Sequence, residues 1–311
     1  MIKIIAPVVV FVYTRLEHTK ETIESLAKNC LANKTEVYIY SDAPKNEKAQ
    51  HHVEQVREYI DTLTKRNLFK SLHIIKAESN KGLAKSIISG VTEIIKQYGK
   101  VIVIEDDLVS SPDFLEYMNE ALNFYESDKE IWSISGYTFK IDIPPNYKSD
   151  VYLSYRGCSW GWATWSDRWN MVDWDMKDYA EFQSNKRLRS KFNLGGLDMA
   201  NMLNAQMKGK IDSWAIRWCY SQSKSDMLTV YPIVSRIKNI GLDGTGTHSG
   251  ITTKYDAILS DGKRKCVFDT PGLEPQIVRS FKDHFGTELD FVVAKIKYII
   301  KKILLMKGTL V

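Results

Sequence analysis

The sequence predicts an α/β domain with a mostly parallel central sheet. Short apolar runs alternate with helical segments over the first third of the 311-residue chain, which is typical of such a sheet. The run at residues 101–104 is unbroken, as expected for a strand that is covered on both faces. With 44% hydrophobic and 26% charged residues, the chain has the composition of a globular protein with a large core.

The elements of the first half follow one another regularly. The expected strands span residues 8–12, 37–40, 72–75 and 101–104. One expected helix spans residues 16–31, and a second follows residue 50 with Val53, Val56 and Ile60 facing inward. A third helix opens near Asn80 and ends at Gly99, a residue that commonly caps helices.

The second half is predicted in less detail. We expect a helix over residues 114–125 and strands over 151–155 and 228–234. Residues 211–218 read as the start of another helix, with Asp212 at or near its N-cap. The basic run at residues 184–191 is expected to be a solvated face.

Three adjacent carboxylates, Glu105, Asp106 and Asp107, follow the strand at residues 101–104. In open α/β sheets, ligands bind beyond the carboxyl ends of the strands. Because neighbouring carboxylates repel one another, their ionised form needs a stabilising partner, and a hard divalent cation would serve. The alternative is that they simply place negative charge near the N-terminus of the next helix.

Tryptophan is concentrated in one short segment, because five of the eight tryptophans lie between residues 160 and 174. Core packing explains some of them. Rings interleaved with glycine and serine also suit a platform for the apolar faces of sugars. Further along, residues 241–250 form a glycine-rich loop that lacks the order of a phosphate-binding P-loop. Its His248 is either exposed and idle or closes over a metal or a diphosphate.

Composition excludes several classes of protein. The four cysteines are scattered and form no CxxC pair, which argues against a disulfide scaffold or a zinc ribbon and fits a reducing compartment. No apolar run approaches the roughly 20 residues that span a bilayer. Residues 291–311 contain five lysines and no acid, and the remainder balances 38 basic against 38 acidic residues. This balance argues against a nucleic-acid-binding fold.

The C-terminal segment has the spacing of an amphipathic helix. Its apolar residues recur at helical intervals: Val292, Ile296, Ile299, Ile300 and Ile303. We expect a basic helix over residues 286–311 that lies on an anionic membrane, rather than an ordinary docked helix with a solvated lysine face. This expectation places the protein in the cytoplasm, peripherally at the inner face of a bacterial plasma membrane.

Taken in order, the motifs resemble those of the GT-A glycosyltransferases. The likeness is greatest to the inverting N-acetylglucosaminyltransferase I type and its bacterial sugar-transferase relatives. The stretches that carry it are residues 7–15, 41–42, 105–108, 111–114, 132–135, 161–162, 212–214 and 234–236. Two positions depart from the family pattern: Ile211 replaces an aromatic residue and Ser213 replaces a second acid.

The resemblance implies a GT-A fold made of two halves. A Rossmann-like nucleotide-sugar-binding half would span residues 1–108, and an acceptor-binding and catalytic half would span residues 109–285. The amphipathic helix over residues 286–311 would follow them.

The resemblance also implies roles for residues that bind the donor. Arg15 and Asp42 would contact the nucleotide, with Asp42 reading the base. Glu105 and Asp106 would face the nucleotide sugar. The loop of Gly161 and Trp162 would help to form the pocket for the donor sugar and the acceptor.

The remaining roles concern the metal and the base. Asp107, with His248 as a weaker candidate, would bind Mn²⁺ or Mg²⁺, which would neutralise the leaving diphosphate. Asp212 would be the catalytic base that takes the proton of the acceptor hydroxyl. One base and a single displacement imply inversion at the anomeric carbon.

The leading hypothesis is therefore a metal-dependent inverting glycosyltransferase. Its expected donor is a UDP-sugar, with UDP-N-acetylglucosamine first, and its expected acceptor is a glycan or lipid-linked saccharide. A sugar nucleotidyltransferase is the alternative enzyme, although its usual glycine- and lysine-rich loop near the N-terminus is absent. A non-catalytic carbohydrate-binding protein is the alternative from another class. The sequence leaves the donor sugar, the linkage and the oligomeric state open.

Overall fold

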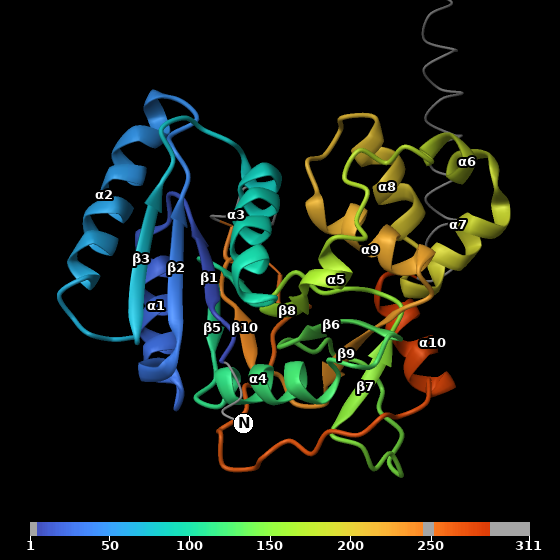
Figure 1. Cartoon of the computed structure of the whole chain (residues 1–311). Coiled ribbons are helices and arrows are strands. Elements are labelled where there is room, and N and C mark those ends of the chain that lie inside the picture. Colours follow the sequence, from blue (N-terminus) through green and yellow to red (C-terminus); the bar gives the residue numbers. More distant parts are fainter. Residues whose placement is uncertain (1–4, 245–251, 287–311) are drawn as a thin grey trace, which may run out of the picture.

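The structure is a computed structural model that describes residues 5–244 and 252–286. In these residues one sheet of eight strands runs through both halves of the protein (Figure 1). Its strands are β1 (Val8–Val12), β2 (Glu36–Ser41), β3 (Ser71–Lys76), β4 (Lys100–Glu105), β6 (Ile131–Ser135), β7 (Val151–Ser154), β8 (Trp162–Trp165) and β9 (Leu228–Pro232).

The strand order across the sheet is β3-β2-β1-β4-β8-β6-β9-β7. The first four strands are mutually parallel, and β8 runs antiparallel to both β4 and β6. Strand β9 is parallel to β6, and β7 is antiparallel to β9. The expectation of a mostly parallel α/β sheet is therefore confirmed. The carboxyl ends of β1, β2 and β4 meet at one edge of the sheet, as a parallel arrangement requires.

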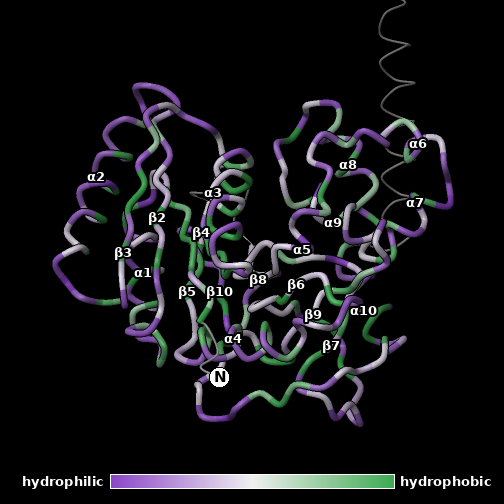
Figure 2. Tube along the Cα trace, in the orientation of Figure 1, coloured by the Kyte–Doolittle hydropathy of each residue, from purple (hydrophilic) through white to green (hydrophobic). Residues whose placement is uncertain are grey.

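Helices cover both faces of the parallel half. They are α1 (Leu16–Ala27), α2 (Glu47–Leu63), α3 (Leu83–Tyr98) and α4 (Phe114–Phe124). Val8 and Val10 of β1 share one core cluster with buried residues of α1, α2 and α4, whereas Val9 shares a second cluster with those of α3. Because alternate residues of a strand point to opposite faces, this division explains why β1 is apolar throughout. Figure 2 shows hydrophobic residues along the strands and many hydrophilic residues along α2.

The second half adds a group of short helices beside α3 (Figure 1). They are α5 (Ser166–Trp169), α6 (Tyr179–Ser184), α7 (Lys186–Phe192), α8 (Met199–Met207) and α9 (Trp214–Lys224), with a single 3₁₀ turn at Asn193–Gly195. Another 3₁₀ turn, Ala32–Lys34, lies in the first half between α1 and β2. The basic run at residues 184–191 thus lies mostly in α7. Helix α10 (Pro275–His284) ends the described part of the chain.

A cluster of tryptophan rings fills the core of this second half. The Trp162 ring lies 5.1 Å from the Trp214 ring and 5.3 Å from the Trp218 ring, measured between centroids. The expected sugar platform is wrong for three of the five clustered tryptophans, because Trp162, Trp165 and Trp169 are at most 2% exposed. The exceptions are the other two, Trp160 and Trp174, which are partly exposed.

A second, two-stranded sheet lies beside the carboxylate triplet. Strand β5 (Leu108–Ser110) pairs antiparallel with β10 (Ile237–Asn239). Neither strand was expected, and neither was β8, because strands of three or four residues are too short to show a hydrophobic period. The pairing places the chain after residue 239 directly against Asp107, whose carbonyl accepts a hydrogen bond from the Ile240 amide at 2.9 Å.

Two further expectations concern membranes and cysteines. None of the helices formed by the described residues is long and apolar enough to cross a bilayer. The expected C-terminal helix lies outside the described residues from residue 287 onward. All four cysteines are free thiols, in agreement with the absence of a disulfide scaffold.

Candidate active site

The residues predicted to bind the donor come together at the carboxyl edge of the sheet. Arg15 follows β1, Asp42 follows β2, and Glu105 is the last residue of β4. Asp106 and Asp107 form the turn that joins β4 to β5. Since these strands are neighbours in the sheet, positions that are up to 92 residues apart in the sequence become adjacent.

Arg15 is the group that stabilises the ionised carboxylates in this structure. Its Nη2 atom contacts the carboxylate of Asp106 and lies 2.9 Å from Oδ2 of Asp107. Burial lowers the pKa of Arg15, but the two carboxylates outweigh burial, so the net shift of its pKa is upward. The sequence predicted a cation beside the acidic triplet, and the first such cation is this guanidinium.

The three carboxyl groups differ in exposure and in pKa. The side chain of Asp106 is only 7% exposed, and burial raises its pKa to about 6 although Arg15 opposes the shift. Burial, reinforced by Asp107 and Asp106, raises the pKa of Glu105 to about 8. A carboxyl group whose pKa is raised in this way can hold a proton and donate a hydrogen bond, whereas an ordinary carboxylate only accepts.

Asp107 is the carboxylate best placed to hold a divalent cation. Its side chain is 16% exposed, which is about twice the exposure of Asp106. No group of three or more histidine, cysteine, aspartate or glutamate side chains in the described ranges is arranged as a complete metal site. One or two carboxylates still fit Mg²⁺ or Mn²⁺ in nucleotide-dependent enzymes, because substrate phosphates and water supply the other oxygen ligands. His248 lies outside the described residues, so its role stays a prediction.

Two residues that were not predicted shape the surroundings of the carboxylates. The Thr22 hydroxyl donates to the Asp106 carbonyl at 2.9 Å and accepts from the Leu108 amide at 3.2 Å, which fixes the turn. Gly241 lies so close to Asp107 and Arg15 that a Cβ atom there would collide with both side chains. Gly241 opens the glycine-rich loop noted in the sequence, whereas nothing in the sequence distinguishes Thr22 from other polar helix residues.

Asp42 anchors the loop that leads into α3. Its carboxylate accepts hydrogen bonds from the backbone amides of Lys81 and Gly82, each at 2.9 Å, and from the Asn80 side-chain amide at 3.1 Å. Both carboxylate oxygens are engaged in this way. The predicted role of Asp42 in reading the base remains a prediction, and its visible role is to hold the start of α3 at the sheet edge.

Asp212 reaches the same edge from the second half of the chain. The N-cap of α9 is Ser213, whose hydroxyl accepts from the Ile216 amide at 3.3 Å, so capping does not occupy Asp212. The Asp212 side chain is exposed, and within the described ranges nothing donates a hydrogen bond to its carboxylate. A Cβ atom added to Gly82 would lie 3.8 Å from Asp212 Oδ2. The carboxylate therefore lies beside the loop that Asp42 anchors.

The Gly161 backbone lies next to the end of β4. Trp162 pairs with Val103 in the sheet, which puts Gly161 beside the last residues of β4. Gly161 has a φ of +61°, and an added Cβ atom would lie 2.5 Å from Ile237 of β10. The Trp162 side chain is only 1% exposed. The Trp162 ring therefore cannot contact a ligand, and this loop could do so through its backbone or through partly exposed side chains such as Ser159 and Trp160.

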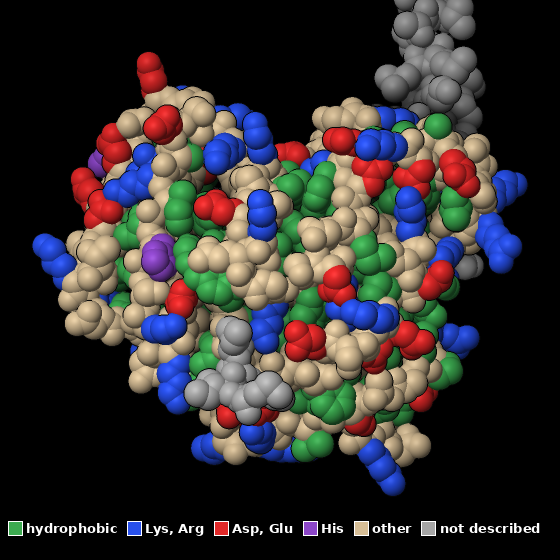
Figure 3. All heavy atoms as spheres, viewed as in Figure 1, with side chains coloured by type: hydrophobic (Ala, Val, Ile, Leu, Met, Phe, Trp, Pro, Cys, Tyr) green, Lys and Arg blue, Asp and Glu red, His purple; other side chains and the backbone are tan. Residues whose placement is uncertain are grey.

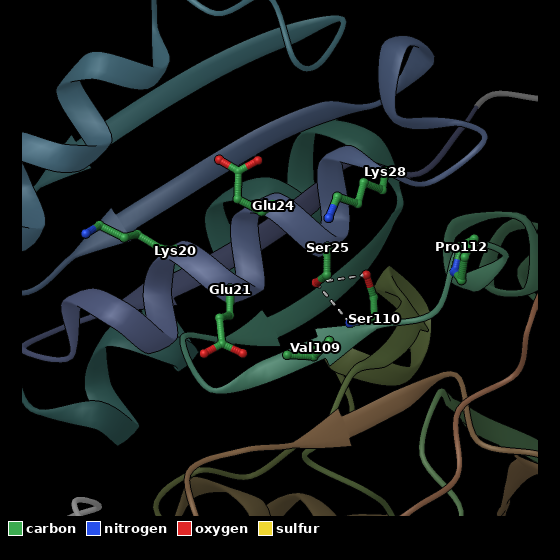
Figure 4. A pocket seen from close by; sticks show the side chains of 8 residues that line it. All are labelled: Lys20, Glu21, Glu24, Ser25, Lys28, Val109, Ser110 and Pro112. Atoms are coloured by element: carbon green, nitrogen blue, oxygen red, sulfur yellow. Dashed lines mark hydrogen bonds between the residues drawn. The ribbon is translucent and has the colours of Figure 1, made fainter.

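A separate hollow of about 420 Å³ lies along α1 and β5 (Figure 4). Its lining residues are Lys20, Glu21, Glu24, Ser25, Lys28, Val109, Ser110 and Pro112. Acidic and basic side chains balance within it, and the Ser25 hydroxyl already accepts from the Ser110 amide at 3.0 Å. None of the predicted site residues lines this hollow.

Comparison with known proteins places these residues in a family context. The GNT-I family model matches residues 1–185, which include every residue predicted to bind the donor but neither Asp212 nor His248. Over 103 residues the chain is 27% identical to the alpha-1,3-mannosyl-glycoprotein 2-beta-N-acetylglucosaminyltransferase of Arabidopsis thaliana. This match covers 30% of the chain and 22% of that enzyme, so the chain spans about a fifth of its length.

Solved structures give a weaker likeness. The crystal structure of S. aureus TarS aligns with a TM-score of 0.32 and 17% identity, over 47% of this chain and 24% of that chain. TarS 1-349 in complex with UDP aligns with a TM-score of 0.29 and 17% identity, over 46% and 38%. Likeness at these scores carries no argument about function.

Proposed function

This chain belongs to the GNT-I family of glycosyltransferases, and from that premise we propose that it is a metal-dependent inverting glycosyltransferase. The proposed donor is a UDP-sugar, with UDP-N-acetylglucosamine first. The relative in Arabidopsis thaliana is named as an N-acetylglucosaminyltransferase, which supports this order of donors. The proposed acceptor is a hydroxyl group of a glycan or a lipid-linked saccharide.

The main support for the proposal is that the carboxylate triplet and Asp212 lie at the same edge of the sheet. The carboxylate triplet and Arg15 lie at the ends of β4 and β1. The carboxylate of Asp212, more than 100 residues later, lies beside Gly82, which Asp42 anchors to the same edge. A donor site and a separate base are the two parts that direct displacement at a sugar carbon requires.

Each residue has a defined task in the proposed reaction. Asp107 would hold Mn²⁺ or Mg²⁺, and the bound cation would supply charge neutralisation for the departing diphosphate. Arg15, which pairs with Asp107, would donate to the same phosphates through its guanidinium fork. Glu105, whose pKa is raised, would face the donor sugar and would donate a hydrogen bond to it in its protonated form. Asp212 would take the proton of the acceptor hydroxyl, and a single displacement inverts the anomeric carbon.

The proposed location is the inner face of a bacterial plasma membrane. Support comes from the one-sided lysine content of residues 291–311, which suits an anionic lipid surface. Deleting residues 291–311 should move the protein from sedimenting anionic vesicles to the supernatant. Unchanged sedimentation of the truncated protein would refute this location.

The experiment that tests the proposed function is a thermal-shift panel of UDP-, GDP-, dTDP- and CMP-sugars, each with and without Mn²⁺. A ligand that binds only the folded state raises the unfolding midpoint by mass action. We expect UDP-N-acetylglucosamine with Mn²⁺ to give the largest shift. A shift with free oligosaccharides and with none of the nucleotides would refute a transferase and favour a carbohydrate-binding protein.

A further inference from the structure

A cavity of about 290 Å³ lies between α3 and the start of α9. Its lining residues are Ala84, Lys85, Ile88, Ser89, Asp212 and Arg217. The first four come from one face of α3, and the last two come from the loop before α9 and from its first turn. In the space-filling view the surface is indented between the part that carries α3 and the part that carries α8 and α9 (Figure 3). The proposed base therefore shares a cavity with two basic side chains.

Arg217 is held rigidly at one side of this cavity. Its Nη1 atom donates to the Trp174 carbonyl at 2.9 Å and its Nε atom to the Ser213 carbonyl at 3.4 Å. Burial lowers the pKa of Arg217, while Asp212 and Asp175 raise it. A guanidinium remains charged in proteins despite such a shift. Within the described ranges its Nη2 atom has no hydrogen-bond acceptor, so part of the fork is available to a ligand.

Lys85 supplies a second positive charge on the opposite side. It lies in the first turn of α3, its side chain is exposed, and no acidic group in the described ranges pairs with its ammonium. The N-terminal turn of a helix adds a partial positive charge. Among the lining residues, two cations therefore face the single carboxylate of Asp212. The lining carries a net charge of +1 at neutral pH.

We propose that this cavity binds a singly charged oxyanion of the acceptor, next to the hydroxyl that Asp212 activates. The acceptor is thereby assigned to the acidic saccharides, which carry either a uronate carboxylate or a phosphodiester. Both groups bear one negative charge and match a guanidinium fork. The Ser89 side chain lines the same wall, and its hydroxyl donates to the Ser86 carbonyl at 3.3 Å. This inference rests on the proposed function, because it takes Asp212 as the base.

The inference can be tested by binding alone. The probes are methyl β-D-glucuronide, methyl β-D-glucoside, and the glucoside that carries a methyl phosphodiester at its 6-position. Dissociation constants are measured by ligand-observed NMR on the full chain, with and without UDP and Mn²⁺. At least one charged probe should bind about tenfold more tightly than the neutral glucoside. The tighter of the two charged probes identifies the source of the oxyanion.

A matched pair of variants tests whether the preference for a charged probe arises in this cavity. Lys85→Glu should remove most of the preference for the charged probe. Lys96→Glu makes the same change of charge on the last turn of the same helix, outside the cavity, and should leave the preference intact. Equal binding of charged and neutral probes, or equal losses in the two variants, would overturn the inference.

The test separates this inference from the proposed function. UDP binding and UDP release from UDP-N-acetylglucosamine are measured in the same preparation without any acceptor probe. Intact donor binding and turnover together with equal probe affinities would overturn only the acidic acceptor. Absent donor binding would overturn the proposed function, while the probe comparison on the free protein would still decide whether the cavity selects oxyanions.

Discussion

Arg15 and Asp107 form an ion pair, with Nη2 of the guanidinium 2.9 Å from Oδ2 of the carboxylate. The same Nη2 atom also contacts Asp106. The guanidinium therefore occupies the place beside the acidic triplet where the sequence predicted a metal ion. A metal ion that binds Asp107 must share this carboxylate with Arg15 or displace the guanidinium from it. Metal binding and the movement of Arg15 are coupled, because the metal ion and Arg15 would both bind the diphosphate of the donor.

The first prediction follows from the competition between Arg15 and a metal ion for the carboxylate of Asp107. Mn²⁺ alone should bind the protein weakly, because Arg15 already neutralises Asp107, whereas Mn²⁺ with UDP should bind much more tightly. Asp107→Asn should abolish the UDP-dependent binding of Mn²⁺. Electron paramagnetic resonance titration of free Mn²⁺ measures both. The same change at an exposed site of α2, Asp61→Asn, is the control, and equal losses in both variants would contradict a ligand role for Asp107.

The second prediction concerns pH and Glu105. Its pKa of about 8 in the folded protein exceeds the ordinary value of 4.5, so the folded state keeps a proton that the unfolded chain loses. Its contribution to stability is fully present below the lower pKa and is lost as the pH rises through the higher one. The slope from one such proton is at most about 1.4 kcal/mol per pH unit.

Glu105→Gln should therefore flatten the decline of the free energy of unfolding between those two pKa values. Urea unfolding of the metal-free protein at several pH values measures this decline. Glu54→Gln on α2 supplies a control carboxyl group at an exposed position. If the wild type and Glu105→Gln lose stability in parallel, the raised pKa of Glu105 is refuted.

The third prediction concerns the close approach of Gly161 to β10. Gly161 and Gly209 have nearly the same left-handed backbone, with φ of +61° and +64°, but only Gly161 has neighbours that an added Cβ atom would meet. Gly209→Ala should lower the free energy of unfolding by about 1–2 kcal/mol through its backbone alone. Gly161→Ala should lose about 1–3 kcal/mol more because of Ile237. Chemical denaturation of the two variants measures the difference, and equal losses would contradict the packing described.

The fourth prediction separates two roles for Asp42. If Asp42 anchors residues 80–82, Asp42→Ala should accelerate hydrogen exchange at the amides of Lys81 and Gly82 and weaken the binding of UDP and CDP alike. If it reads the base, the variant should lose the preference for UDP over CDP while exchange stays slow. Exchange mass spectrometry with nucleotide titrations distinguishes these outcomes, and the second would show that anchoring is not its main task.

Local sequence patterns were sufficient for the parallel half of the fold. Strand β1 is apolar throughout, and β4 contains four consecutive β-branched residues, Val101 to Ile104. Gly99 ends α3 with a φ of +76°, as expected of a C-cap. Local patterns did not predict short strands whose pairing partners lie far away in the sequence. The tryptophan-rich segment that contains β8 was left open between core packing and a sugar platform, because Trp-Ala-Thr-Trp in isolation does not reveal that β4 and β6 flank it.

The acidic residues of the site could be predicted from the sequence, whereas their contacts with other residues could not. Carboxylates that follow an apolar strand mark a sheet edge, so residues 105–107 could be identified from the sequence. The ion pair with Arg15 depends on β1 and β4 being neighbours in the sheet, which no local pattern records. Asp212, which was expected at or near the N-cap of α9, lies one residue before the N-cap Ser213, and this position leaves its carboxylate without a capping bond.

The measurement that tests the account most directly is the turnover of UDP-N-acetylglucosamine with Mn²⁺ by the wild type and by Asp212→Asn, followed by proton NMR. The wild type should transfer the sugar to water or to an added acidic saccharide with inversion, so that hydrolysis releases the β-anomer first. The variant should bind the donor equally well but turn it over about 10²–10⁴-fold more slowly, since it lacks the base. Undiminished turnover by Asp212→Asn, or first release of the α-anomer, would contradict the account.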